Sequence, residues 1–163
     1  MDMLPVDRSS AERWLLGTDE LTILATSEQT GGDIFAVEIR MPPGGGPPVM
    51  HRHTPSEIYH VLEGQFTFYV GAPPSAVRRV EAVAGDVVPL AGNTPHTIRN
   101  ESSSDAVAFV VHSPAATMEG FSRAAAAMAV QGSPGIEDVL ALAEEHGIEM
   151  LGPVPPISSS GTS

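Results

Sequence analysis

Apolar and polar residues alternate along much of the first two thirds of the chain. Between Phe35 and Met41 the odd positions are all apolar, whereas the even positions 38 and 40 carry charges. Because successive side chains of a strand point to opposite faces, this pattern predicts a half-buried strand over residues 33–41. Further apolar runs, separated by turns rich in Gly, Pro, Asp and Asn, predict strands at 21–26, 57–62, 66–70, 77–83, 86–90, 96–99 and 106–112. Many short strands with few helices are typical of a β-sandwich or barrel.

After residue 113 the pattern changes from strand to helix. Residues 115–130 are rich in Ala, and apolar side chains recur at helical spacing from Met118 to Met128. A Ser-Pro pair at 133–134 predicts the start of a second short helix, and Gly147 its end. The apolar stripes favour a clamp packed on the barrel or at a subunit contact. The alternative is a lid over the barrel mouth.

These patterns divide the chain into three parts. We expect a β-rich barrel over residues 1–113 and a helical extension over residues 114–150. The Ser- and Pro-rich end, residues 151–163, is expected to be a disordered tail.

Composition and charge narrow the class of protein. The chain has 163 residues, of which 42% are hydrophobic, so it is long enough for one domain with a real core. Its net charge of −12 and its scattered arginines argue against nucleic-acid binding. No apolar run approaches the ~20 residues that cross a membrane, and the N-terminus lacks the pattern of a secretory signal. A cytoplasmic location is therefore expected.

Two residue types are absent from the sequence. Without Cys there is no thiol nucleophile, disulfide or iron–sulfur cluster. Without Lys there is no Schiff base and no lysine acid or base. The chemistry of a site therefore falls mainly to histidines and carboxylates.

Three of the six histidines lie together in the stretch VMHRHTPSEIYHVLEG. His51 and His53 are two residues apart, so both imidazoles point to one face of an extended chain. Glu57 begins the next predicted strand. If it faces the same interior, His60 faces away, and Glu63 falls at a solvated hairpin turn.

A metal site needs more than two imidazoles and one carboxylate, because a divalent transition metal usually takes a fourth ligand. His146 lies near the end of the second predicted helix, where a cation-capable side chain is favourable in any case. His112 closes the last predicted strand, where an exposed position would account for it. His96 begins a strand directly after a constrained turn, and is the best candidate.

The spacing of these residues resembles the cupin superfamily, whose fold is a double-stranded β-helix, or jelly-roll, barrel. The first cupin motif is Gly, five residues, His-x-His, three or four residues, Glu, six residues and Gly. The sequence matches it throughout with Gly45, His51, His53, Glu57 and Gly64. The resemblance covers about residues 15–113, and it implies that the two histidines and Glu57 bind a metal.

The second cupin motif is matched only in part. Gly85, His96 and Asn100 are in place, but Ala91 stands at the Pro position and Asn93 at the second Gly position. That Gly makes a tight turn with positive φ, and Asn is the residue other than Gly that best tolerates such a φ. We therefore expect the turn to survive and His96 to remain the fourth ligand.

The overall form, an all-β cupin barrel followed by two short helices, resembles bacterial quercetin 2,3-dioxygenase-like cupins. This resemblance implies a metal-dependent dioxygenase acting on a small aromatic or enolisable substrate, with Glu57 as general base. The alternatives are a redox-neutral isomerase, cyclase or decarboxylase, and a barrel that only binds a small molecule. Fe, Mn, Ni, Cu, Co and Zn all suit the ligand set. The resemblance also implies a homodimer.

The predicted substrate pocket is apolar with one phenol, and consists of Phe35, Ile39, Met41, Tyr59, Ile98 and Phe109. Arg40, Arg52 and Arg99 fall on the opposite parity, so no cation is expected in the pocket. Oxalate or a sugar phosphate would require such cations. An uncharged organic substrate fits better.

Overall fold

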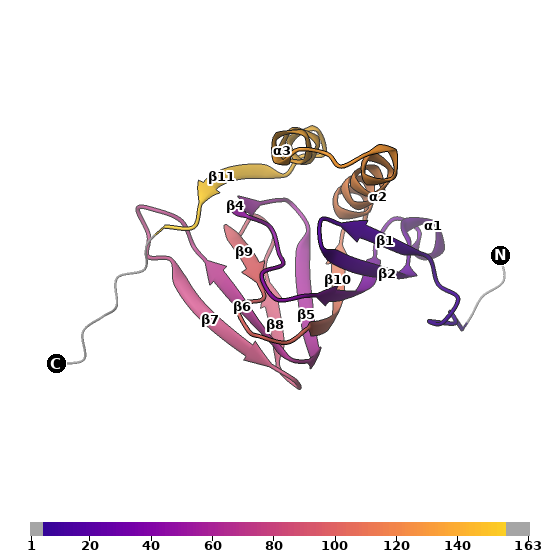
Figure 1. Ribbon diagram of the computed structural model, residues 1–163, viewed down its shortest axis with the longest axis horizontal. Coiled ribbons are helices and arrows are strands. Elements are labelled where there is room, and N and C mark those ends of the chain that lie inside the picture. The colour runs from indigo at the N-terminus through magenta and orange to yellow at the C-terminus, as the bar shows by residue number, and fades with distance from the viewer. Residues whose placement is uncertain (1–4, 156–163) are drawn as a thin grey trace.

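The computed structural model describes residues 5–155 and places the strands in two antiparallel sheets that face each other (Figure 1). The first sheet has the order β1-β2-β3-β10-β5-β8, and the second has the order β11-β4-β9-β6-β7. The strands are β1 (Arg13–Leu16), β2 (Asp19–Ala25), β3 (Phe35–Met41), β4 (Val49–Arg52), β5 (Ser56–Glu63), β6 (Gln65–Val70), β7 (Arg78–Val83), β8 (Val87–Leu90), β9 (His96–Arg99), β10 (Ala106–Ser113) and β11 (Glu149–Pro153). The helices are α1 (Ser27–Thr30), α2 (Ala116–Gln131) and α3 (Ile136–Glu145).

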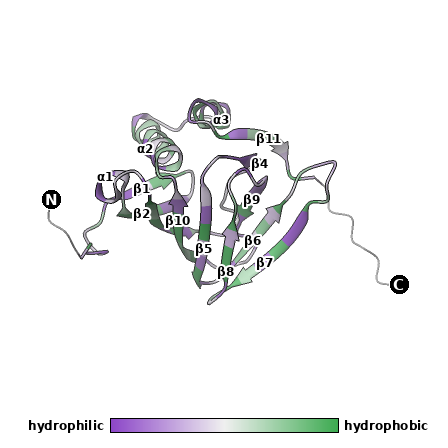
Figure 2. Ribbon diagram, turned by 180° about the vertical axis from the view of Figure 1, so that it is seen from behind, coloured by the Kyte–Doolittle hydropathy of each residue, from purple (hydrophilic) through white to green (hydrophobic). Residues whose placement is uncertain are grey.

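Alternating side chains build the core between the two sheets. In β5 every second residue from Glu57 to Val61 is buried, and the residues between them are exposed. Hydrophobic and hydrophilic positions likewise alternate along many strands in Figure 2. The fully buried side chains in the middle of the barrel include Phe35, Phe66 and Phe68. All-β architecture with a jelly-roll barrel, as predicted, is therefore the observed fold.

Most predicted elements are present, with ends that differ by at most about two residues. Three short strands, β1, β4 and β11, and the single turn of α1 were not predicted. The second C-terminal helix is capped by Gly135, not by Ser133. Across the described residues, no helix is both long and apolar enough to cross a membrane.

The C-terminal segment packs on the barrel through α2, which contacts β1 and β3 (Figure 1). The guanidinium of Arg123 in α2 lies 4.7 Å from the ring centre of Trp14 in β1. Farther along the chain, β11 pairs with β4 and so places Met150 opposite His51. The predicted boundary of a tail at residue 151 is therefore wrong, because residues 151–153 belong to this strand. Residues 156–163 lie outside the described part of the chain.

Candidate metal centre

Three histidines converge at one end of the barrel. His51 in β4 and His96 in β9 are register partners across the sheet, and His53 follows directly after β4. One ring nitrogen of each lies within 4.8 Å of the others. His51, His53 and His96 are 8%, 3% and 3% exposed, so they are buried and are not solvated surface histidines.

The turn at 91–95 holds two of these histidines in place. Asn93 has a φ of 63°, which confirms the expectation that Asn takes the left-handed conformation there. Its backbone N–H donates to the carbonyl oxygen of His53 at 2.7 Å. A Cβ at Gly92 would lie 2.1 Å from the carbonyl oxygen of Thr54, so the close approach of the two loops requires Gly at this position. The altered motif therefore still delivers His96 to the cluster.

Each imidazole is oriented in the same way. The Nδ1 atoms of His51, His53 and His96 lie 3.2, 3.0 and 2.8 Å from the carbonyl oxygen of a residue two positions away in the chain. A carbonyl oxygen only accepts, so these contacts place the hydrogen on Nδ1 and leave a lone pair on Nε2. Metal-bound histidines commonly have this arrangement.

Glu57 brings a negative charge to the cluster. Its Oε1 lies 3.2 Å from His53 Nε2, and its Oε2 lies 3.0 Å from His96 Nε2. Burial raises the pKa of Glu57, but its contacts with the His112, His53 and His96 imidazoles outweigh burial and hold the pKa well below the usual range. The carboxylate is therefore ionised at neutral pH.

Electrostatics also keep His51 neutral. Burial, followed by the neighbouring His96, lowers the pKa of His51 to about 4. For His96 burial acts in the same direction, but its contacts with Glu57 outweigh burial and raise the pKa above the usual value. At neutral pH the cluster thus offers at least one imidazole that needs no deprotonation before it binds a metal.

Two buried atoms in the cluster lack a hydrogen-bond partner among the described residues: His53 Nε2 and Glu57 Oε2. Both lie at ion-pair distance from neighbours, but those contacts do not have the orientation of hydrogen bonds. Buried polar atoms without partners are costly. A divalent transition metal coordinated by imidazole nitrogens and a carboxylate oxygen would satisfy them. The residues present therefore fit a single metal ion.

The structure adds a residue to the site that the sequence analysis missed. His112 is register partner of both Phe35 and Glu57, because β10 lies between β3 and β5. It is buried, and its Nε2 lies 3.1 Å from Glu57 Oε1. It does not belong to the group of three imidazoles whose nitrogens lie within 4.8 Å.

The assignment of Phe109 to the pocket is wrong. Phe109 is register partner of Glu38 in β3 and of His60 in β5, on the outer face of the sheet. His60 is exposed on this face, away from the cluster. Phe109 and His112 have opposite parity in β10, and it is His112 that points inward, although its place at the end of the strand had suggested an exposed position.

The other predicted pocket residues face the barrel interior. Phe35, Met41, Tyr59 and Ile98 are buried in the core, and Ile39 is partly buried against it. Whether they contact a substrate stays a prediction.

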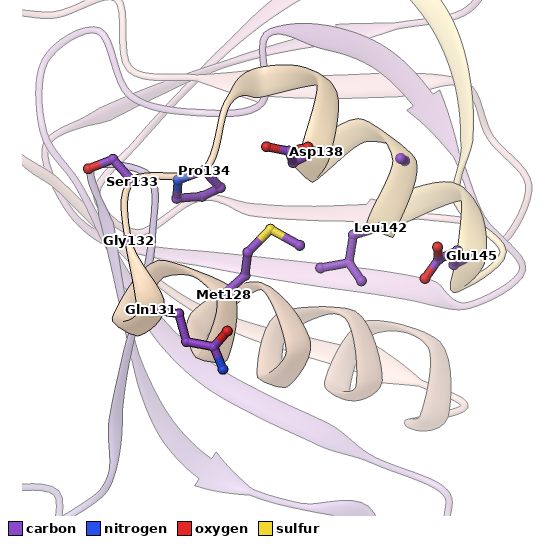
Figure 3. A pocket seen from close by; sticks show the side chains of 9 residues that line it. Met128, Gln131, Gly132, Ser133, Pro134, Asp138, Leu142 and Glu145 are labelled. Atoms are coloured by element: carbon purple, nitrogen blue, oxygen red, sulfur yellow. The ribbon is translucent and has the colours of Figure 1, made fainter.

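A separate groove lies between α2 and α3, with Met128 and Leu142 pointing into it (Figure 3). Its titratable residues are the acidic Asp138 and Glu145, and it contains none of the histidines. It is therefore not the metal centre.

Comparison with known proteins agrees with the fold and the motif spacing. Residues 37–112 match the family model of the cupin domain. This segment is therefore similar to the cupin domain, and His51, His53 and His96 all lie within it. No relative was found among curated proteins.

Several solved structures share the fold. A predicted oxalate decarboxylase from Thermotoga maritima is 24% identical with a TM-score of 0.58, and the match covers 68% of this chain and 99% of that one. The polyketide cyclase RemF from Streptomyces resistomycificus is 19% identical with a TM-score of 0.59, covering 69% and 80% of the two chains. A sugar phosphate isomerase from Silicibacter pomeroyi is 18% identical with a TM-score of 0.57, covering 69% and 77%. At these identities the likeness describes the fold and not the reaction.

Proposed function

We propose that the protein is a metal-dependent enzyme of the dioxygenase type, acting on a small aromatic or enolisable substrate. The observation that carries the proposal is the buried cluster of three imidazoles with the ionised Glu57 against two of them. His51, His53, His96 and Glu57 would hold one ion of Fe, Mn, Ni, Cu, Co or Zn. Such an ion would supply Lewis acidity to a substrate oxygen and, if redox-active, electron transfer to O₂.

Glu57 has two roles in this proposal. Its low pKa makes it a good anionic ligand and a weak base. It can therefore accept a proton at Oε2 only from an acidic hydroxyl, such as that of an enol or a phenol. This limit favours enolisable and phenolic substrates over simple alcohols.

Tyr59 is expected to remain neutral. Burial, then the negative charges of Glu57 and Asp19, raise the pKa of its phenol well above the usual value. A neutral phenol can donate a hydrogen bond to a bound substrate, but it cannot act as a base at neutral pH.

The arginines favour an uncharged substrate. Arg40 pairs with Asp105, Arg52 pairs with Glu149, and Arg99 donates to the carbonyl oxygen of Pro48. None of these three is free to neutralise a substrate carboxylate or phosphate in the barrel. Oxalate and sugar phosphates, named in the descriptions of two structural neighbours, are therefore poor candidates here.

The test combines metal analysis with oxygen uptake. Protein loaded separately with Fe²⁺, Mn²⁺ and Ni²⁺ is mixed with a flavonol or a related enediol, and O₂ consumption is recorded with an oxygen electrode. The proposal predicts metal-dependent O₂ consumption that His96→Ala abolishes and His60→Ala preserves. Substrate conversion without O₂ consumption would instead establish a redox-neutral isomerase, cyclase or decarboxylase.

A barrel that only binds a small molecule gives a third outcome. It would show ligand-induced thermal stabilisation with no conversion under any metal. Differential scanning fluorimetry with the same compounds identifies this case.

We also propose that the protein forms a homodimer through the outer face of β5 and β8. Ile58, Leu62 and Val87 on this face are 47%, 40% and 57% exposed, which is unusual for large apolar side chains of neighbouring strands. The net charge of −12 opposes self-association elsewhere on the surface. Light scattering should give the mass of two chains, and Leu62→Glu should reduce it to one. A monomeric wild-type protein would refute the proposal.

A further inference from the structure

His112 is the one histidine that contacts Glu57 but stands outside the cluster of three imidazoles. Its Nε2 lies 3.1 Å from Oε1 of Glu57, whereas Oε2 of the same carboxylate is buried and unpaired among the described residues. The two carboxylate oxygens are therefore in different surroundings. Oε1 lies between Nε2 of His112 and Nε2 of His53, at 3.1 and 3.2 Å, whereas Oε2 faces only Nε2 of His96, at 3.0 Å.

The ring of His112 is held by contacts on its other side. Its Nδ1 lies 3.3 Å from the carbonyl oxygen of Phe35, and the Phe35 ring stacks on it with centroids 5.5 Å apart and planes 24° apart. Trp14 stacks behind Phe35 at 6.2 Å, and the guanidinium of Arg123 lies over Trp14. A continuous stack from the helix surface to the carboxylate therefore fixes the orientation of the imidazole.

We propose that His112 is a positioning residue for Glu57. It holds Oε1 by donation from Nε2 and so presents Oε2 to the ion that the three imidazoles bind. Carboxylate ligands are themselves usually hydrogen-bonded, and such partners tune both affinity and geometry. The Nδ1 of His112 lies 3.3 Å from a neutral carbonyl oxygen, whereas its Nε2 lies 3.1 Å from a carboxylate oxygen. Because a carboxylate is the stronger acceptor, the proposal assigns the ring hydrogen of His112 to Nε2. This inference rests on the metal-binding part of the proposed function.

The test compares two substitutions at position 112 with one control. His112→Phe keeps a ring that can stack on Phe35 but removes the donor. His112→Gln loses the ring but keeps an amide N–H able to reach Oε1. His60→Phe, on the exposed face of β5, is the control. If His112 served packing alone, the Phe variant would be the milder of the two.

Two properties of the Co²⁺-loaded protein are measured: the Kd, by competition with a chromophoric chelator, and the visible absorption spectrum. His112→Phe is expected to raise the Kd about 10- to 100-fold and to alter the spectrum, because the carboxylate loses its fixed orientation. His112→Gln and His60→Phe should stay close to wild type. A His112→Phe protein with wild-type Kd and spectrum would overturn the proposal.

A double-mutant cycle separates positioning from direct ligation. If His112 acts only through Glu57, then His112→Phe should cost no further affinity in a Glu57→Gln background. A further loss of affinity in that background would show that His112 binds the metal itself, and would overturn the positioning role. Near-UV circular dichroism of Trp14 checks folding, and His112→Leu replaces His112→Phe if the latter does not fold.

The experiment needs no substrate, so its outcome is separable from the proposed reaction. The wild-type protein could bind Co²⁺, and the double-mutant cycle could give the expected result, while no O₂ is consumed with any metal. That outcome would rule out the dioxygenase proposal and leave the role of His112 intact. Wild-type protein that takes up no Co²⁺ would overturn both.

Discussion

The barrel interior contains two buried carboxylates whose pKa values are shifted in opposite directions. Glu57 is 2% exposed and Asp19 is 7% exposed, so depth alone does not separate them. Imidazoles outweigh the effect of burial at Glu57 and hold its pKa well below the usual range. At Asp19 burial dominates, opposed only by the backbone N–H of Gly46, and raises the pKa to about 7.

The two carboxylates lie towards opposite ends of the same sheet. Glu57 is level with Phe35 and His112, whereas Asp19 begins β2 beside the end of β3 that pairs with Ala106. Asp19 is packed under the loop between β3 and β4, since a Cβ on Gly45 would lie 2.5 Å from its Oδ1. A buried carboxylate that stays charged therefore marks the end of the barrel that contains the three histidines, and a buried carboxyl whose pKa is raised marks the other end.

The largest expected effect is a loss of bound metal at the end of the barrel that contains His51, His53 and His96, called here the histidine end. It is tested by removing one imidazole. His96→Ala should reduce bound metal from about one ion per chain to well below that, because a site left with two imidazoles and one carboxylate binds far more weakly. His60→Ala, which alters an exposed histidine on the outer face, is the matched control. Elemental analysis after loading and dialysis gives the ratio of metal to protein. An unchanged ratio in His96→Ala would falsify the assignment of His96 to the site.

The next largest effect is a change in the pH dependence of folding stability, caused by Asp19 at the other end of the barrel. Between pH 3.8 and about 7 the folded protein retains a proton on Asp19 that the unfolded chain has released, so stability falls as the pH rises across this interval. Asp19→Asn has no charge to bury. At pH 8 we expect it to be more stable than wild type by up to about 4 kcal/mol, with no gain at pH 4. Urea denaturation of metal-free protein at both pH values measures the difference, and an equal gain at both would contradict the explanation.

At the histidine end, folding stability should depend on pH in the opposite direction from that at Asp19. Between pH 6.5 and about 4 the unfolded chain binds a proton at His51 that the folded protein excludes, so stability falls as the pH falls. Asp19 opposes this trend over the same range, so the measurement belongs in the Asp19→Asn background. There, metal-free protein should lose about 2 to 3 kcal/mol between pH 6.5 and 4.5.

His51→Gln in that background should flatten the acid slope, because Gln does not titrate. The other groups facing His51, namely His53, His96 and Glu57, are left intact. The same slope with and without His51 would mean that another group governs acid stability.

Local patterns in the sequence predicted His51, His53 and Glu57, because these three residues are closely spaced, whereas His96 was predicted from the turn before it and from the second cupin motif. His51 and His53 share a face by strand geometry alone, and Glu57 follows four residues later, near the start of β5. The strong alternation of β5 also separated Glu57 from His60 correctly. These inferences needed no knowledge of which strands pair.

The inward face of β10 and the burial of Asp19 depend on contacts between residues far apart in the chain, which the local sequence pattern does not reveal. Residues 106–111 of β10 are all apolar, so no polar residue marks which face is inward, and the parity of Phe109 and His112 was ambiguous. Only the pairing of β10 between β3 and β5 places His112 on Glu57. The buried state of Asp19 likewise depends on a distant loop, the one containing Gly45.

The smallest expected effect concerns the turn that supports the histidine end. Asn93 adopts a φ of 63° and donates to the carbonyl oxygen of His53. Asn93→Gly should leave both thermal stability and metal content unchanged, since Gly takes this conformation freely. Asn93→Val should cost about 1 to 2 kcal/mol, because a β-branched side chain is strained at positive φ. Thermal unfolding of the metal-free variants tests this. Equal stability of the Val and Gly variants would show that the turn relaxes, and that the histidine end is less rigidly supported than its backbone contacts imply.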